Sequence, residues 1–323
     1  MANRTAVALK LTVSSDDPWP GMWASFERAL KAEGKAERTL KTYGESAHVF
    51  HTWSLSNHLP TDLGHIDKQQ VERFVIWLRE EGAKPATVRV RFAALRRFFN
   101  WAVEEDEIKA SPMARMHGPK VDDPEEIPLS EADLRKLFDA CTGGSFEARR
   151  DTAMIRLMFD SGLRRREVAA LMVEDLDLPG KQARVTRKGG KEGFAVFGNQ
   201  VARDLDRYLR MRDRHPLNDE TVTRDGVKVQ PLWLAQKGQL TADGVHFVIK
   251  HRAEQAGITR RVFPHLFRHT FAHMLKSQGA TDEIVMALGG WSDSKSMRRY
   301  GAGARMQRAR DAHKDLSPGD RLR

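Results

Sequence analysis

The sequence predicts a mainly α-helical protein with a small β-sheet, divided into a helical bundle and a mixed α/β domain. Four amphipathic helical patterns fill residues 19–110, and a proline-rich segment occupies residues 111–128. Beyond that segment, helical patterns continue but are interrupted by one β-hairpin pattern. With 323 residues, the chain is long enough to form two domains with a core in each.

The composition favours a polyanionic partner. Lys and Arg number 54 against 44 Asp and Glu, which gives a formal net charge of +10, and nucleic acid is the commonest partner of such proteins. The single cysteine, Cys141, excludes a disulfide within the chain and fits a reducing cytosol. The longest apolar run covers only residues 168–173, which is too short for a membrane span or a secretory signal. We therefore expect the protein to work in the cytoplasm.

The first domain is predicted to be a bundle of four helices that follows a flexible arm at residues 1–18. WASFERALKAEG starts the first helix, Thr39 is a plausible N-cap of the second, and the third starts near Asp67. The fourth helix is TVRVRFAALRRFFNWAV. Apolar residues at spacings of three and four predict faces that close a small bundle. In the fourth helix these residues are Val88, Phe92, Leu95, Phe99 and Ala102.

Basic residues surround the apolar stripe of the fourth helix, and no acidic residue interrupts residues 83–103. They are Lys84, Arg89, Arg91, Arg96 and Arg97. One interpretation is a solvated basic face, and the other is a surface that contacts DNA phosphates.

Residues 111–130 contain four prolines and a glycine, which exclude a helix or a central strand. We interpret residues 111–128 as an interdomain linker. Ser130 then caps the first helix of the second domain, which spans residues 129–303, and Gly162 ends a later helix.

Within the second domain, ARVTRKGGKEGFAVFG predicts a β-hairpin with its turn at Gly189–Gly190. The segment HPLNDETVTRDGVKVQ is interpreted as a loop. From residue 241 onward the pattern is helical, with glycine stops at residues 257, 279 and 289–290.

The sequence contains no motif for several common types of nucleotide-binding or metal-dependent enzyme. The sequence lacks the P-loop pattern, GxGxxG and HExxH. His265, His269 and His273 recur four apart on one predicted helix and could suggest a metal face, but no cysteine pairs support one. We expect phosphate chemistry without a nucleotide, a metal or another cofactor.

Attack on a phosphodiester needs fixed cations, a proton donor and a positioned nucleophile. Four separated stretches supply suitable groups: SGLRRREVAAL, RKGGK, PHLFRHTFAH and LGGWSDSKSMRRYG. Their candidate residues are Arg164, Lys188 or Lys191, His265, Arg268, Trp291 and Tyr300. Taken singly, each has an ordinary interpretation as a surface charge or a packing aromatic. His265 and Arg268 lie one helical turn apart and so share a face.

Taken in order, these motifs resemble the tyrosine recombinase (phage integrase) family. The resemblance rests on GLRxxE, a hairpin lysine, HxxR, and LGxW followed at nine residues by tyrosine. It covers the chain from about residue 19 to the end. The fold it implies is a helical, core-type DNA-binding domain at residues 19–110 and a tyrosine-recombinase catalytic domain at residues 129–303.

The resemblance implies roles for the site residues. Arg164 and Arg268 would clamp the scissile phosphate, and His265 would hydrogen-bond that phosphate and assist proton transfer. Lys188 would protonate the departing 5′ oxygen. Tyr300 would attack to form a 3′-phosphotyrosyl link.

Two supporting residues follow from the same resemblance. Trp291 would pack beside the site with its indole N–H directed at the phosphate, where many members have histidine. Glu167 would orient the arginine cluster. The family often has glycine before the hairpin lysine, whereas this chain has Arg187, so the choice between Lys188 and Lys191 stays open.

The function that the resemblance implies is site-specific recombination that integrates or excises a phage or mobile element in the cytoplasm or nucleoid of a bacterial host. The partner would be double-stranded DNA at core-type attachment sites, because the short N-terminal arm leaves no arm-binding domain. Strand exchange would pass through a Holliday junction in a homotetramer. An accessory directionality factor could assist.

Residues 304–323 form a basic tail with Met306, Ala309, Ala312 and Leu316 at helical spacing. We expect this tail to dock on a neighbouring protomer in trans. Two alternatives to the recombinase remain. One is a type IB topoisomerase-like enzyme, and the other is a non-catalytic DNA-binding regulator.

Overall fold

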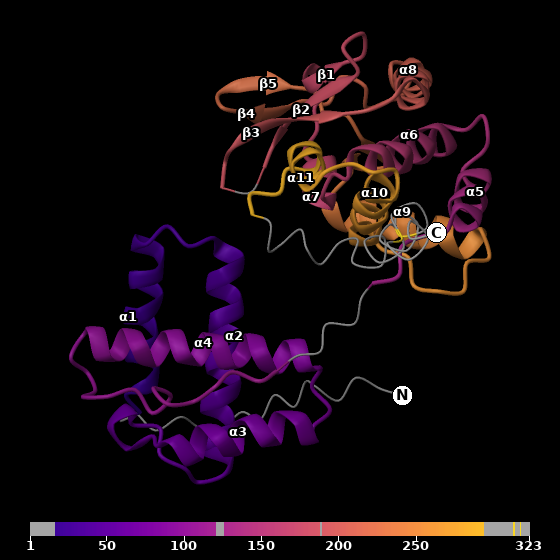
Figure 1. The fold of residues 1–323 in the computed structure, drawn as a ribbon. Helices are drawn as coiled ribbons and strands as arrows, with labels where there is room; N and C mark the ends of the chain where they lie inside the picture. The colour runs from indigo at the N-terminus through magenta and orange to yellow at the C-terminus, as the bar shows by residue number, and fades with distance from the viewer. Residues whose placement is uncertain (1–16, 121–125, 188, 294–312, 314–316, 318–323) are drawn as a thin grey trace. The chain divides into compact units, whose positions relative to one another are not determined.

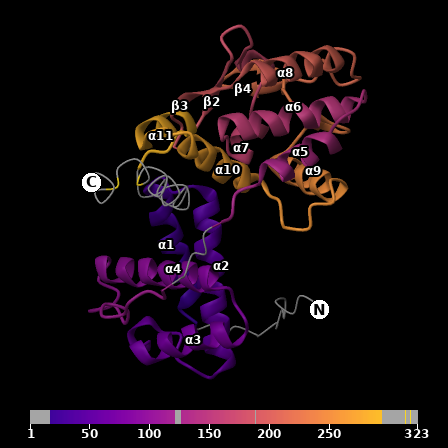
Figure 2. The ribbon, with the colours of Figure 1, turned by 45° about the vertical axis from the view of Figure 1, so that its right-hand side comes forward.

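The structure, a computed structural model, describes residues 17–120, 126–187 and 189–293 and the single positions 313 and 317. The chain forms two compact units, Met1–Pro124 and Glu125–Arg323. The described residues are mostly helical with small antiparallel sheets, which confirms the predicted fold class (Figures 1 and 2). No helix in these ranges combines the length and apolar character needed to cross a lipid bilayer.

The N-terminal unit contains four helices: α1 (Trp19–Ala32), α2 (Glu37–Ser56), α3 (Lys68–Glu80) and α4 (Pro85–Glu104). Helix α2 packs against α1 and α4, and α4 also packs against α3 (Figure 1). The apolar face predicted for α4 is buried throughout. The Asp67 side chain accepts a hydrogen bond from the Gln70 backbone N–H (2.8 Å), which confirms the predicted start of α3.

The predicted N-cap of α2 was wrong. The helix already begins at Glu37, and Ala36 occupies the N-cap position without a side-chain hydrogen bond. Thr39 lies inside the first turn, where its backbone N–H donates to the Ala36 carbonyl (2.7 Å). The helix therefore starts three residues before the position expected from Thr39, although threonine is a more favourable capping residue than alanine.

Aromatic residues dominate the core of this bundle. Phe26, Phe50, Phe74 and Phe98 are fully buried, and the rings of Phe50 and Phe74 meet edge to face with centroids 5.0 Å apart. The chain beyond α4 also joins this core, because Met113 is buried within it. The first residues of the segment interpreted as a linker therefore pack on the N-terminal unit.

The C-terminal unit alternates helices with short strands. Its helices are α5 (Glu131–Ala140), α6 (Phe146–Ser161), α7 (Arg165–Ala169), α8 (Asn199–Arg212), α9 (Ala242–Gln255), α10 (Pro264–Ser277) and α11 (Asp282–Gly289). Its strands are β1 (Leu176–Asp177), β2 (Gln182–Thr186), β3 (Glu192–Val196), β4 (Val222–Arg224), β5 (Val227–Val229), β6 (Leu234–Ala235) and β7 (Gly238–Gln239). Helix α6 is central, since it packs against α8, α10 and β3 (Figures 1 and 2).

The structure contains the predicted β2–β3 hairpin, with Gly189 and Gly190 at its turn. The strands pair antiparallel from Gln182 opposite Val196 to Thr186 opposite Glu192. Gly189 and Gly190 both have positive φ, at 84° and 76°, which glycine adopts without steric cost. Strand β1 completes a three-stranded sheet in the order β1-β2-β3.

A second hairpin, β4–β5, lies in the segment that was interpreted as a loop. Its turn holds Asp225 and Gly226, with φ values of 51° and 80°. Asp-Gly is a strong hairpin signal, but only three residues on each side form strands. The interpretation of this segment as a loop was therefore wrong, and its Asp-Gly pair is the sequence signal for the hairpin.

Two glycines end the helices that lead toward the candidate site. Gly162 has a φ of 64° and caps α6, as predicted, and Gly290 has a φ of 65° and caps α11. Gly162 also lies against a ring, because a Cβ built on it would be 2.5 Å from Phe271 Cδ1. This close approach joins α6 to α10.

We predict that Gly162→Ala destabilises the protein by about 2–4 kcal/mol, because it adds overpacking against Phe271 to the cost of a left-handed residue. Gly257→Ala is the matched control. Its φ is 66°, but a Cβ there meets nothing within 4 Å, so only about 1 kcal/mol should be lost. Urea unfolding of both variants measures the difference. Equal losses would show that the contact with Phe271 carries no strain.

Candidate active site

Arg164 sits where α6 turns into α7. Gly162 ends α6, and Arg164 takes the N-cap position of α7. Its backbone N–H donates to Glu167 Oε2 (2.8 Å), and its Nη1 donates to Glu167 Oε1 (2.7 Å). The Glu167 carboxylate is buried, so one side chain both caps the helix and holds the guanidinium in place.

Arg268 lies on α10 and is only 1% exposed. Its Nη1 donates to two backbone carbonyls, that of Gly162 (2.8 Å) and that of Gly289 (2.7 Å). The Trp291 ring lies against the guanidinium, with the ring centroid 3.5 Å from Arg268 Cζ. This geometry is a cation–π contact, so Trp291 packs on Arg268 beside the candidate site.

His265 and His269 follow one another on α10, with ring centroids 5.1 Å apart and an edge-to-face arrangement. Although part of His265 faces solvent, the protein packed around it lowers its pKa, and the charges of Arg268 and Arg164 act in the same direction. Burial lowers the pKa of His269 to about 4. Both imidazoles are therefore neutral at pH 7 and can accept or donate a hydrogen bond.

A pocket of about 390 Å³ brings Arg164 and His265 together. Its other lining residues are Arg165, Arg166, His246, Arg261, Phe263 and Pro264. Four of the lining residues are arginines, and guanidinium forks suit an anionic oxygen group such as a phosphate. The motif after Gly162 predicted an arginine here, but no motif predicted Arg261, which joins the pocket from the segment before α10.

Arg187 is a second residue that the sequence analysis did not place in the site. It follows β2, and burial lowers the pKa of its guanidinium, with Arg164 lowering it further and Glu167 opposing. Arg187 and Arg268 both donate to the Gly289 carbonyl, so the two guanidinium groups lie close together. The only signal in the sequence was its position before the hairpin lysine, where the family often has glycine.

The structure therefore brings together five of the predicted residues, namely Arg164, Glu167, His265, Arg268 and Trp291. Lys188 and Tyr300 lie outside the described residues, as does the tail from 304 apart from positions 313 and 317. Lys191 is described and is exposed. Among the residues described, no group of three or more His, Cys, Asp or Glu is placed to hold a metal ion.

The basic residues predicted on α4 differ in their surroundings. Lys84 and Arg89 are exposed. Arg91 is half-buried, and burial lowers the pKa of its guanidinium while the nearby Glu45 opposes this. Lys84 and Arg89 are thus accessible to a DNA backbone.

The other two basic residues of α4 already have intramolecular partners. Arg96 donates to the Met116 carbonyl, and Arg97 forms ion pairs with Glu33 and Glu104. Contact with DNA phosphates would have to compete with these bonds.

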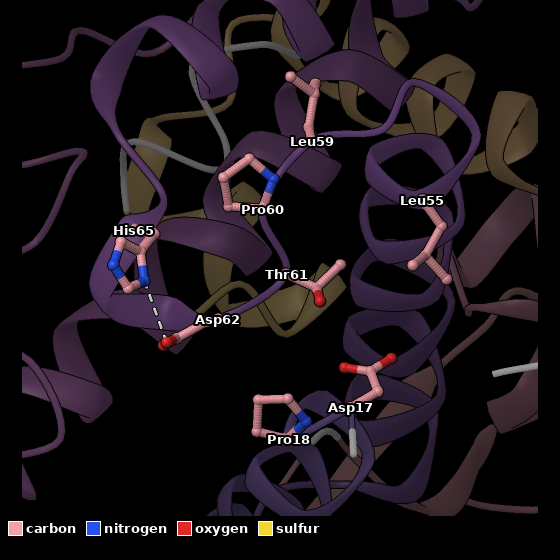
Figure 3. A pocket seen from close by; sticks show the side chains of 8 residues that line it. All are labelled: Asp17, Pro18, Leu55, Leu59, Pro60, Thr61, Asp62 and His65. Carbon is pink, nitrogen blue, oxygen red and sulfur yellow. Dashed lines mark hydrogen bonds and ion pairs between the residues drawn. The ribbon is translucent and has the colours of Figure 1, made fainter. Parts of the chain in front are cut away.

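The N-terminal unit has a pocket of its own, of about 470 Å³ (Figure 3). It is lined by Asp17, Pro18, Leu55, Leu59, Pro60, Thr61, Asp62 and His65. A hydrogen bond from the Gly64 backbone and one with His65 (3.0 Å) lower the pKa of Asp62, so this carboxylate stays charged. A pocket with such a carboxylate does not favour a phosphate, and none of the predicted site residues lies in it.

Comparison with known proteins identifies the class. Residues 128–306 match the phage integrase family, and residues 22–109 match the N-terminal SAM-like domain of phage integrases. The chain is 30% identical over 284 residues to the tyrosine recombinase XerD of Pseudomonas putida, which covers 87% of this chain and 92% of that protein. It is 25% identical to the tyrosine recombinase XerC of Staphylococcus saprophyticus, covering 84% and 88% respectively.

Solved structures share the fold. The Tn1549 transposon integrase superposes with a TM-score of 0.73 at 17% identity, covering 93% of this chain and 99% of that one. The XerH site-specific recombinase gives a TM-score of 0.71 at 19% identity, covering 90% and 84%.

The chain is therefore a site-specific tyrosine recombinase, an enzyme class that cleaves and rejoins DNA. It belongs to the phage integrase family, and the expected resemblance is confirmed. The comparisons favour this class over a topoisomerase-like enzyme and over a non-catalytic regulator.

We predict that acid destabilises the folded chain in part through His269. Above pH 6.5 His269 is neutral in both the folded and the unfolded chain. Below pH 6.5 the unfolded chain binds a proton at this residue, whereas in the folded chain His269 stays neutral until the pH approaches its pKa of about 4. Stability should fall between pH 6.5 and 4 by up to about 1.4 kcal/mol per pH unit from this residue. His269→Gln should make the pH dependence shallower in urea unfolding. Parallel curves for the two proteins would contradict this.

Proposed function

We propose that this enzyme exchanges DNA strands at core-type sites through a 3′-phosphotyrosine intermediate, with its active site in the pocket lined by Arg164 and His265. The observation that carries the proposal is that Arg164 and His265 line one pocket, with the buried Arg268 three residues after His265 on α10. Arg164 and Arg268 hold the non-bridging oxygens of the scissile phosphate, where negative charge builds in the transition state. The neutral His265 hydrogen-bonds the same phosphate and assists proton transfer.

In the chemical step, the Tyr300 hydroxyl attacks the phosphorus, and the bond to the 5′ oxygen breaks. A free phenol has a pKa of about 10, so nearby guanidinium groups lower the cost of forming the phenolate. Lys188 gives a proton to the departing 5′ oxygen. The new phosphotyrosyl ester replaces the broken phosphodiester, so attack by a 5′-hydroxyl can reseal the strand without a nucleotide or a metal.

Two residues act by positioning these groups. Glu167 fixes the Arg164 guanidinium while it caps α7, and Trp291 covers the Arg268 guanidinium. In a phosphate complex, the indole N–H of Trp291 would also donate to the substrate.

DNA is the proposed partner. The Tn1549 integrase was solved with transposon right end DNA, and XerH was solved with a palindromic difH substrate. In this chain Lys84, Arg89 and Arg91 contribute phosphate contacts from the N-terminal domain, with Arg96 and Arg97 rearranging to join them. Binding should weaken with salt by a log–log slope of about −0.9 per neutralised phosphate.

The assembly we propose is a homotetramer that resolves a Holliday junction, with the tail at 304–323 docked on the next protomer in trans. Each protomer would consist of an arm at 1–18, a core-type DNA-binding domain at 19–110, a linker at 111–128 and a catalytic domain at 129–303. The reaction integrates or excises a mobile element in the bacterial cytoplasm, with a directionality factor as a further partner.

We predict that Tyr300→Phe binds DNA with unchanged affinity but forms no covalent adduct, because a phenyl ring has no nucleophilic oxygen. A suicide substrate with a nicked strand traps the adduct for denaturing electrophoresis. The wild-type chain should also join two plasmids that each carry the core site.

Tyr43→Phe is the matched control, because Tyr43 lies on α2 and is not among the candidate site residues, and it should leave the adduct intact. An adduct formed by Tyr300→Phe would show that another residue is the nucleophile. Adducts from the wild type without any joined plasmids would favour the topoisomerase-like reaction.

We predict that deleting residues 304–323 weakens assembly on DNA more than it weakens the binding of one protomer. Removing a segment that docks in trans breaks each contact of a cyclic assembly while leaving each DNA contact in place. Analytical ultracentrifugation with a Holliday junction measures the tetramer, and a half-site binding assay measures the single protomer. An unchanged tetramer and full recombination by the truncated chain would contradict trans docking.

A further inference from the structure

We propose that Arg187 is a positioning residue that fixes the lysine-bearing end of the β2–β3 hairpin to the C-terminus of α11. The inference rests on the proposed function, because it assumes that the hairpin lysine supplies the proton to the leaving oxygen.

The side chain of Arg187 joins the hairpin to Gly289, which lies 102 residues further along the sequence. Its Nη1 donates to the Gly289 carbonyl at the end of α11 (2.8 Å), and its Nη2 donates to the Phe194 carbonyl on β3 (2.8 Å). The planar guanidinium fork donates to both acceptors from two different nitrogen atoms held in a fixed geometry, whereas an ammonium group has a single nitrogen. The end of the hairpin is therefore tied to α11 rather than only to its own strands.

The backbone around Arg187 is held as firmly as its side chain. Its N–H donates to the Lys191 carbonyl (2.7 Å), and its own carbonyl accepts from the Gly190 N–H (3.1 Å). These two bonds close the turn that joins β2 to β3. Position 188 follows Arg187 directly in the sequence, so Arg187 is a described neighbour of the proposed proton donor.

Two glycines make room for this side chain. A Cβ built on Gly290 would lie 1.7 Å from Arg187 Nη1, and one built on Gly193 would lie 2.7 Å from Arg187 Nε. Any larger residue at either position would displace the guanidinium. The guanidinium therefore occupies a slot between β3 and the turn that ends α11.

The Gly289 carbonyl is also shared with the candidate active site. It accepts from Arg187 Nη1 (2.8 Å) and from Arg268 Nη1 (2.7 Å), as a carbonyl with two lone pairs can. One carbonyl oxygen therefore fixes both the end of the hairpin, through Arg187, and the side chain of Arg268. A glycine at position 187 could make none of the side-chain bonds, so this chain positions its hairpin by a contact that glycine cannot supply.

The test separates positioning of a proton donor from general support of the fold. We would measure the single-turnover rate of adduct formation on two suicide substrates that differ in the scissile bridging atom, 5′ oxygen or 5′ sulfur. A thiol has a pKa of about 8.5, so a thiolate leaves without protonation. Loss of a correctly placed proton donor therefore slows only the oxygen substrate.

Arg187→Met keeps the length of the side chain and removes its donors. We expect it to slow adduct formation about 10- to 100-fold on the oxygen substrate, within the range for general acid catalysis, and to stay within about threefold of wild type on the sulfur substrate. Arg187→Lys keeps the charge and should show a smaller loss with the same recovery. Lys188→Ala should reproduce the pattern of Arg187→Met in full.

Arg184→Met is the matched control, because Arg184 lies on β2, three residues before Arg187, but pairs with Asp175. It should keep wild-type rates on both substrates. Thermal melting and DNA affinity of each variant report whether the fold is intact.

Equal slowing of both Arg187 variants on the two substrates, or no slowing on either, would overturn the positioning role while leaving the proposed function in place. Failure of the sulfur substrate to rescue Lys188→Ala would remove the proton donor from residue 188 and overturn the inference with it. A wild-type chain that forms no adduct on either substrate would overturn the proposed function itself.

Discussion

The backbone carbonyl of Gly289 is the contact on which the geometry of the candidate site depends. Arg268 and Arg187 both donate to it, and Arg268 also donates to the carbonyl of Gly162. Carbonyls at the ends of helices lack partners within the helix and carry partial negative charge, so they are suited to hold cations. Because these acceptors are neutral, these particular bonds hold the guanidinium groups without cancelling their charge.

Elsewhere in the same unit, arginines are held by carboxylates instead. Arg224 donates two hydrogen bonds to the buried Asp175 (2.8 Å each), so a carboxylate neutralises part of its charge. Arg164 lies between these extremes. The Glu167 carboxylate holds its guanidinium but also caps α7, so correct folding of that short helix and correct placement of Arg164 are one event.

Local features of the fold could be predicted from the sequence because they depend on neighbouring residues. The cap at Asp67, the stop at Gly162 and the hairpin turn at Gly189 are of this kind. The shared face of His265 and Arg268 follows from helical spacing alone. The contact between Arg187 and Gly289 could not be predicted, because it joins segments far apart in the chain and depends on where α11 packs. The roles of Lys188 and Tyr300 still rest on the resemblance of the motifs.

The slot around Arg187 has a consequence for how this sequence can diverge. Gly290 is required twice, once for its left-handed backbone and once because the arginine fills the space of a Cβ. A lineage that replaced the arginine with a small residue would relax the second requirement at positions 193 and 290 together, whereas a lineage that first enlarged either glycine would expel the arginine. Positions 187, 193 and 290 should therefore change as a linked set across related chains, in an order that the packing imposes.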